Sequence, residues 1–192
     1  MRFALAVGVL VPIVYFGAQL LAAPFYPGYS FLRQAASELG SDRSDRPGIL
    51  NAGAMLTGIA AIVAACAMPV ALPREKSPRF LAWLTAVAMI SMGIGAIWAG
   101  VNPLPSPRHN SGPIGAGMFF VPLLFAIALW RRGGALRVYL LVNVALFVLL
   151  VPLMSGASGI DVNPFRGFLQ RIAAAVLYVP IGVVSAALLR RR

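Results

Sequence analysis

Five polar residues have side chains suited to ligand binding or acid–base chemistry, and each lies in or beside a connector between long apolar stretches. They are Glu38, Asn51, Arg108, His109 and Arg171. Imidazole and carboxylate groups can move protons, whereas guanidinium and amide groups donate hydrogen bonds to a polar headgroup. We expect the five to meet at one membrane boundary and form a ligand-binding site, for which Arg171 is the starting point.

Simpler structural roles compete with that hypothesis. Arg171 lies at the edge of an apolar stretch, where an unpaired charge is costly, and Glu38 or Asp161 is within plausible reach as its partner. An ion pair of this kind would attach the first connector to the last apolar stretch. His109 has an alternative role as a neutral loop residue that orders its neighbours.

The remaining residues argue against several kinds of chemistry. One histidine does not supply the paired ligands of a transmembrane haem, and one histidine with one cysteine does not favour a zinc site. The only lysine, Lys76, lies outside the apolar stretches, which excludes a retinal Schiff base. No stretch carries a carboxylate near its middle, as ion-coupled carriers generally do. We therefore expect no metal and no cofactor, and the sequence assigns no catalytic residue.

The elements that position these residues are six apolar stretches, each long enough to cross a bilayer as a helix. The chain has 192 residues, is 60% hydrophobic and only 11% charged. This pattern predicts an all-α integral membrane bundle of six transmembrane helices, forming one domain over residues 1–192. The predicted spans run from about Phe3 to Ala23, Ile49 to Leu72, Phe80 to Val101, Pro113 to Trp130, Ala135 to Met154 and Phe168 to Leu189.

Positive charge is distributed unevenly between the two sides of this six-span arrangement. One side has ten basic residues and one acid, and the other has six basic residues and four acids. The positive-inside bias of short loops then predicts cytoplasmic N- and C-termini, with Arg190, Arg191 and Arg192 at the lipid headgroups. Topology accounts for the high net charge, so nucleic acid is not an expected partner.

The first connector is too apolar for a solvated linker. Its residues Phe31, Leu32, Ala35, Ala36 and Leu39 recur at helical spacing before Gly40, a residue typical of a helix C-terminus. We expect an interfacial or re-entrant helical segment between the first and second spans, roofing the bundle.

Small and polar residues inside the spans predict how the helices pack. Ala54 with Gly58, and Ala96 with Gly100, are spaced four apart and allow close approach of helices in lipid. Gln19 and Asn143 are neutral polar groups within spans, for which we expect interhelical hydrogen bonds.

Several of these short segments resemble a known family, the multi-pass prokaryotic membrane proteins grouped as domain of unknown function 998 (DUF998). The resemblance rests on segments 29–30 and 37–40, Asn51 with Gly53, Gly100, His109, and segment 167–171. It implies a six-helix fold in a prokaryotic cytoplasmic (inner) membrane, with no activity to transfer. The chain has Asn102-Pro103-Leu104 where members often have a Pro-Thr-Asp-like turn and lacks their further histidine, which argues against a metal or acid–base role.

Three functions are compatible with these features. The first is a lipid- or amphiphile-binding protein with an outward-facing polar site. The ligand's acyl or prenyl tail would be held by helices that are kinked at prolines within the spans, such as Pro12 and Pro180. The second is a non-catalytic accessory subunit of a membrane complex, with a membrane-protein partner. The third is a lipid-modifying enzyme with His109 or Glu38 as base. The sequence favours binding or structural roles over catalysis, because no nucleophile with its base and no paired carboxylates are present.

Overall fold

The computed structural model describes residues 1–190, and within them every regular element is helical. Six helical stretches are long and apolar enough to cross a membrane, which confirms the predicted fold class and identifies a multi-pass membrane protein. Their bounds lie within a few residues of the predicted spans. They are Arg2–Phe25, Gly48–Glu75, Arg79–Val101, Gly112–Arg132, Gly134–Met154 and Asn163–Leu189.

Several spans combine an α-helix with shorter pieces. The first is α1 (Arg2–Ala22) followed by η1 (Ala23–Phe25), and the second is α2 (Gly48–Ala65), α3 (Met68–Ala71) and η3 (Leu72–Glu75). The third is α4 (Arg79–Val101). The fourth is η4 (Gly112–Phe119), α5 (Val121–Ala128) and η5 (Trp130–Arg132), the fifth is α6 (Gly134–Met154), and the sixth is η6 (Asn163–Phe165) with α7 (Arg166–Leu189).

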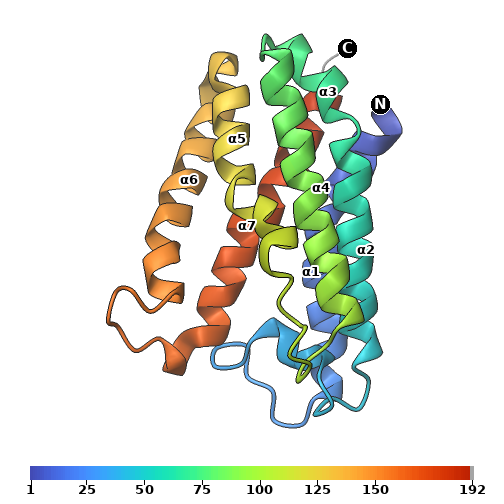
Figure 1. Ribbon diagram of the computed structural model, residues 1–192, viewed down its shortest axis with the longest axis vertical. Coiled ribbons are helices and arrows are strands. Elements are labelled where there is room, and N and C mark those ends of the chain that lie inside the picture. Colours follow the sequence, from blue (N-terminus) through green and yellow to red (C-terminus); the bar gives the residue numbers. More distant parts are fainter. Residues whose placement is uncertain (191–192) are drawn as a thin grey trace.

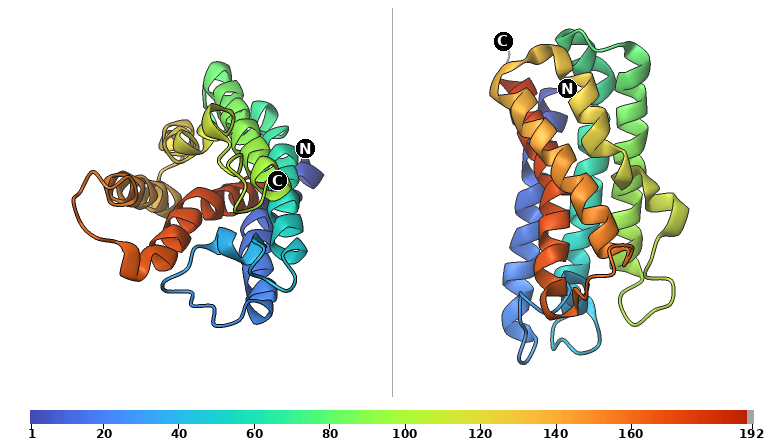
Figure 2. Two further views of the ribbon diagram at one scale, coloured as in Figure 1. Left: turned by 60° about the horizontal axis from the view of Figure 1, so that its bottom comes forward. Right: turned by 90° about the vertical axis from the view of Figure 1, so that its left-hand side faces the viewer.

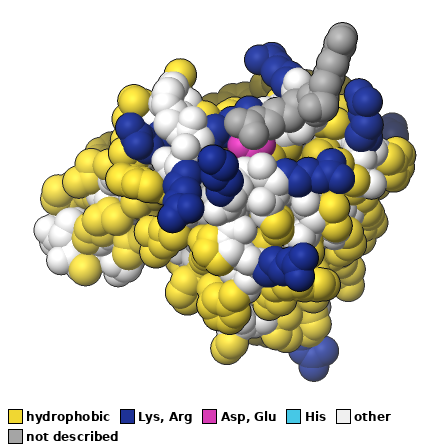
Figure 3. All heavy atoms as spheres, turned by 90° about the horizontal axis from the view of Figure 1, so that it is seen from above, with side chains coloured by type: hydrophobic (Ala, Val, Ile, Leu, Met, Phe, Trp, Pro, Cys, Tyr) yellow, Lys and Arg dark blue, Asp and Glu magenta, His cyan; other side chains and the backbone are white. Residues whose placement is uncertain are grey.

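The start of α1 and the end of α7 lie at one end of the bundle, close to α3 (Figure 1). We call this the terminal end, and the opposite one the connector end. Helices α1, α2, α4 and α7 pack together, while α5 and α6 lie to one side of them (Figure 2). Lys and Arg side chains gather over the terminal end (Figure 3). There the Arg132 Nη1 lies 3.6 Å from Glu75 Oε1, and Arg132 Nη2 donates to the carbonyl oxygen of Ala187. Of the arginine tail, Arg191 and Arg192 lie outside the described residues.

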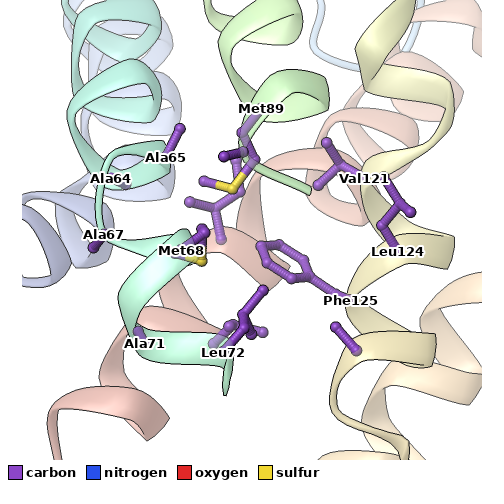
Figure 4. Close-up of a cluster of buried hydrophobic side chains, with 14 of the residues drawn as sticks. Ala64, Ala65, Ala67, Met68, Ala71, Leu72, Met89, Val121, Leu124 and Phe125 are labelled. Carbon is purple, nitrogen blue, oxygen red and sulfur yellow. The ribbon is translucent and has the colours of Figure 1, made fainter. Parts of the chain in front are cut away.

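The main core is formed by α2, α3, α4 and α5, with buried residues of α1, α6 and α7. Met68, Met89 and Phe125 are fully buried and point toward one another from α3, α4 and α5 (Figure 4). In lipid, side chains have apolar surroundings whether or not they pack, so close van der Waals contact is what favours association. This core therefore holds the terminal half of the bundle together and leaves the connector half to other contacts.

A close helix contact joins α2 to α4 through glycines. A Cβ atom added to Gly58 would lie 2.3 Å from the carbonyl oxygen of Gly93, and one added to Gly100 would lie 2.6 Å from the carbonyl oxygen of Asn51. Only a hydrogen fits at these two positions. The close approach expected from the small residues at Gly58 and Gly100 is thus confirmed.

The fourth span begins differently from its prediction as a regular helix from Pro113. Residues Gly112–Phe119 form a 3₁₀-helix, pressed so closely against α4 that a Cβ on Gly117 would lie 2.1 Å from the carbonyl oxygen of Ala88. The Ser91 hydroxyl donates to Ile114 O at 2.6 Å and accepts from Gly117 N at 2.9 Å. These two bonds from α4 satisfy backbone groups that a regular α-helix would pair internally.

The two polar residues within spans behave differently. Asn143 of α6 donates through Nδ2 to the carbonyl oxygen of Val176 in α7 at 3.1 Å, as expected. For Gln19 the expected interhelical bond is wrong, because its Nε2 reaches back 3.4 Å to the carbonyl oxygen of Tyr15 in its own helix. A carbonyl one turn earlier is within reach of the side chain without any neighbouring helix.

The glycine contact between α2 and α4 can be tested with Gly58→Ala. The added methyl group meets the backbone carbonyl of Gly93 as well as the Ile97 side chain, so we expect a loss of about 1–3 kcal/mol. Gly17→Ala is the matched control, because a Cβ atom there meets nothing within 4 Å. Thermal unfolding of both variants in the same detergent should show a lower midpoint for Gly58→Ala only, and equal midpoints would contradict the close packing.

Candidate functional site

The first connector covers the connector end of the bundle, as expected, but its helical part is short. Residues 31–34 form a turn, and only Ala36–Gly40 (η2) is helical, as a 3₁₀-helix that ends at the predicted Gly40. Leu39 is fully buried in a small cluster with Ala18 and Ala22 of α1 and Leu50 of α2. We call residues 29–40 the roof segment.

Arg171, in the first turns of α7, holds the roof segment by its backbone. Its Nη1 donates to three carbonyl oxygens, those of Phe31 at 2.9 Å, Gln34 at 3.0 Å and Gly167 at 2.8 Å. Its Nη2 donates to the hydroxyl of Tyr29. The guanidinium also lies over the Phe31 ring, 4.7 Å from its centroid, in a cation–π contact. One side chain therefore fixes both the path and the position of the turn.

The expected carboxylate partner of Arg171 is wrong. Its partners are carbonyls and a phenol, and the carboxylate of Glu38 instead accepts from the backbone N–H of Ala35 at 2.9 Å. The same bonds explain why the roof segment is not the expected helix. Arg171 occupies the carbonyls of Phe31 and Gln34, and the Gln34 Oε1 accepts from Ser30 N, so these groups are not left to an α-helical ladder.

Further bonds from α7 align the roof segment with the helix. Gln170 Oε1 accepts from Ala36 N at 2.5 Å, and Phe168 N donates to the carbonyl oxygen of Leu32 at 3.0 Å. Burial raises the pKa of Tyr29, and Arg171 opposes this rise only in part. The Tyr29 hydroxyl thus stays protonated at neutral pH and donates to Ala35 O at 3.0 Å.

A cavity of about 170 Å³ lies beneath the roof segment, between α1, α2, α4 and α7. Of the five predicted site residues, Asn51 and His109 line it. Glu38 lines a different pocket nearer the surface, Arg171 is absent from the lining, and Arg108 is exposed. The cavity is lined by Tyr15, Ala36, Ser37, Leu50, Asn51, Ala54, Ala96, Ala99, His109, Gln170 and Tyr178.

Hydrogen bonds fix what the two predicted residues present to the cavity. His109 Nδ1 lies 2.8 Å from the carbonyl oxygen of Asn102, and because a carbonyl only accepts, Nδ1 carries the proton in the neutral ring. Its Nε2 is then a free acceptor. The amide nitrogen of Asn51 donates to the carbonyl oxygen of Gly40 at 3.0 Å, which closes the end of η2. The Oδ1 of Asn51 remains as a further acceptor.

Sequence reasoning missed Tyr15, Ser37, Gln170 and Tyr178. Tyr15 and Tyr178 stack with ring centroids 4.4 Å apart, and neither hydroxyl hydrogen-bonds to another of the described residues. The available signal was a tyrosine within each of two spans, since a phenol inside a membrane generally needs a polar partner. Their pairing depends on how α1 and α7 meet, which the sequence does not encode locally.

A larger apolar groove adjoins the cavity. It has a volume of about 590 Å³ and shares Tyr15, Gln170 and Tyr178 with the cavity as common wall. The rest of its lining comes mainly from η4, α6 and α7. Phe119 and Phe147 both line it, and their tilted rings pack together with centroids 6.4 Å apart. A polar compartment and an apolar one therefore meet at the tyrosine pair.

No metal centre is formed in the part of the chain that the structure describes, where no three His, Cys, Asp or Glu residues gather. His109 and Glu38 line separate pockets, so they do not make an acid–base pair over one cleft.

Comparison with known proteins gives one match. A family model described as "Protein of unknown function (DUF998)" matches residues 9–187, nearly the whole chain. Neither the curated proteins nor the solved structures contain a match.

The attachment of the roof segment can be tested with Arg171→Ala. The variant leaves the carbonyls of Phe31 and Gln34 without their charged donor, and we expect a loss of about 2–4 kcal/mol. Arg166→Ala is the control, because Arg166 is exposed and lies five residues earlier, at the start of the same helix. Detergent thermostability should fall for Arg171→Ala alone, and tryptic cleavage at the exposed Arg33 should become faster. Equal behaviour of the two variants would mean that Arg171 does not hold the roof segment.

Proposed function

The chain belongs to the DUF998 family, whose function is unknown, and from that premise we propose that it binds a lipid or another amphiphile at the connector end. The observation that carries the proposal is the shared wall of Tyr15, Gln170 and Tyr178 between a polar cavity and an apolar groove. An amphiphile has the same division between a polar head and an apolar tail. The head would occupy the cavity under the roof segment and the tail would lie in the groove.

The size and surroundings of the groove support this assignment. Small-molecule sites generally have volumes of about 300–1,000 Å³, are mostly apolar and contain a few directed polar groups. The groove has about 590 Å³ and apolar walls from α6 and α7, which lie within membrane spans. A tail can enter such a groove directly from the bilayer, without crossing water.

The roof segment gives the head a defined boundary. Ala36 and Ser37 line the cavity, and Ala36 N is bonded to Gln170, which also lines it. Asn51 faces the same cavity while its amide closes η2. Hydrogen bonds thus already fix Ala36, Gln170 and Asn51 in the polar wall, and groups held in this way lose little conformational entropy when a ligand binds.

The enzyme hypothesis receives less support. Its two candidate bases, His109 and Glu38, line different pockets, and Glu38 is engaged with the backbone of the roof segment. Binding without chemistry is the function that the geometry favours.

We also propose that the connector end faces away from the cytoplasm of a prokaryotic inner membrane. The support is the charge distribution, since the terminal end carries most of the basic residues and the positive-inside bias places such an end in the cytoplasm.

Amphiphile binding can be tested by filling the cavity. Ala54→Leu adds a branched side chain to the cavity wall, whereas Ala52→Leu adds the same atoms at an exposed position of α2. Native mass spectrometry of the gently extracted proteins should show a retained lipid-sized mass in the wild type and in Ala52→Leu, and a reduced amount in Ala54→Leu. A retained protein subunit with no lipid would favour the accessory-subunit alternative instead.

The orientation can be tested by cysteine labelling in a Cys66→Ala background. Asp42 and Arg74 are exposed and lie at opposite ends of the bundle. In intact cells we expect a membrane-impermeant maleimide to label Asp42→Cys and to label Arg74→Cys only after permeabilisation. The reverse pattern would contradict cytoplasmic termini.

A further inference from the structure

Among the described residues, no Lys, Arg, Asp or Glu lines the polar cavity. Its polar side chains are two phenols, two carboxamides, one serine hydroxyl and one imidazole, and its other lining residues are apolar. This is unexpected in a chain with sixteen Lys and Arg residues, six of them on the connector side. The charge is present near the cavity but does not line it.

Arg171, the basic residue most closely connected with the cavity, is unavailable to a ligand. Its Nη1 donates to three carbonyls and its Nη2 to Tyr29. Its Nε is buried without a hydrogen-bond partner among the described residues, so it is out of reach of a headgroup as well. While the His109 ring is neutral, a phosphate or carboxylate in the cavity would lack a cationic partner, and a buried unpaired charge is strongly disfavoured.

The free polar atoms define which neutral head fits. His109 Nε2 and Asn51 Oδ1 are acceptors, because the other polar atom of each side chain is bonded to a backbone carbonyl. The Gln170 amide nitrogen is a donor, since its Oε1 is taken by Ala36 N. The hydroxyls of Tyr15 and Tyr178 can donate or accept. The cavity therefore offers donors and acceptors together, which suits a hydroxyl group, itself both donor and acceptor.

We infer that the ligand is an uncharged amphiphile with a hydroxyl head, whose hydroxyl lies between His109, Asn51, Gln170 and the tyrosine pair, and whose apolar chain occupies the adjoining groove. Long-chain alcohols, prenols and monoacylglycerols share this chemistry, whereas phospholipids, fatty acids and lipid phosphates do not. The inference rests on the proposed function and narrows it to one class of headgroup.

The inference can be tested with three probes that have one chain and different heads. Oleyl alcohol, oleyl phosphate and oleylamine are titrated into the purified protein in a mild detergent, and the bound fraction is measured by native mass spectrometry. The common chain makes the groove contribution the same for all three. We expect the alcohol to bind at least about tenfold more tightly than either charged probe, because the charged heads have no counterion in the cavity.

Variants then locate the head. Tyr178→Phe removes one hydroxyl from the cavity and keeps the stacked ring, so we expect about two- to tenfold weaker binding of oleyl alcohol. His109→Ala should act in the same direction. Tyr139→Phe is the matched control, because Tyr139 lies on α6 and is absent from the lining of both the cavity and the groove. Binding of oleyl phosphate should change little in any of the three.

The possible results separate the inference from the proposed function. Equal or tighter binding of oleyl phosphate or oleylamine would overturn the neutral hydroxyl head and leave amphiphile binding intact. A preference for the alcohol that neither Tyr178→Phe nor His109→Ala weakens would also overturn it, because the head would lie elsewhere. If none of the probes binds and the extracted protein retains no lipid, the inference and the proposed function both fail.

Discussion

The connector half of the molecule depends on the guanidinium of Arg171, which donates hydrogen bonds to three backbone carbonyls. Arg171 bonds to Phe31, Gln34 and Gly167 and thereby places Ala36 and Ser37 over the cavity. Hydrogen bonds from a charged donor contribute about 1.5–3 kcal/mol each, against about 0–1 kcal/mol for an exposed ion pair. Carbonyls also accept the hydrogen bonds of the guanidinium without requiring a second buried ion. The roof, the cavity and the shape of the polar wall follow from this arrangement.

The six spans were predictable because they depend on two properties that a sequence states directly, namely the length of an apolar stretch and the absence of charge within it. The partners of Arg171 were not predictable from the sequence. Three of them are backbone carbonyls, and because every residue has one, no residue type marks which carbonyls will accept. The sequence drew attention to Glu38 and Asp161 as the nearby acids, and neither bonds to it. Asn51 and His109 were predicted as site residues from their positions near span ends on the connector side, and both line the cavity. Tyr15 and Tyr178 needed the packing of α1 on α7, which is a property of the whole bundle.

At the start of the fourth span, contact with α4 accompanies a 3₁₀ backbone in place of the regular α-helix that the apolar sequence predicts. Gly117 approaches α4 too closely for any side chain, and Ser91 supplies hydrogen bonds to the backbone of η4. A 3₁₀-helix rises about 2.0 Å per residue against about 1.5 Å in an α-helix, so the same residues extend further along the bundle. The altered backbone also leads to Met118 and Phe119, which form the η4 side of the apolar groove. A tight glycine contact on one face of η4 thus accompanies an open compartment on another.

The distribution of charge and the chemistry of the cavity have a common physical basis. Arginines at the terminal end lie where headgroups and water can solvate them, and Arg171 is engaged by the carbonyls of Phe31, Gln34 and Gly167. Placing any of these charges in the cavity lining would require a permanent counterion there, and none of the five acids lines it. With the charges held elsewhere, neutral donors and acceptors are left to contact a ligand. Selectivity at such a site comes from the direction of its hydrogen bonds and from the cost of bringing in a charge, rather than from attraction between ions.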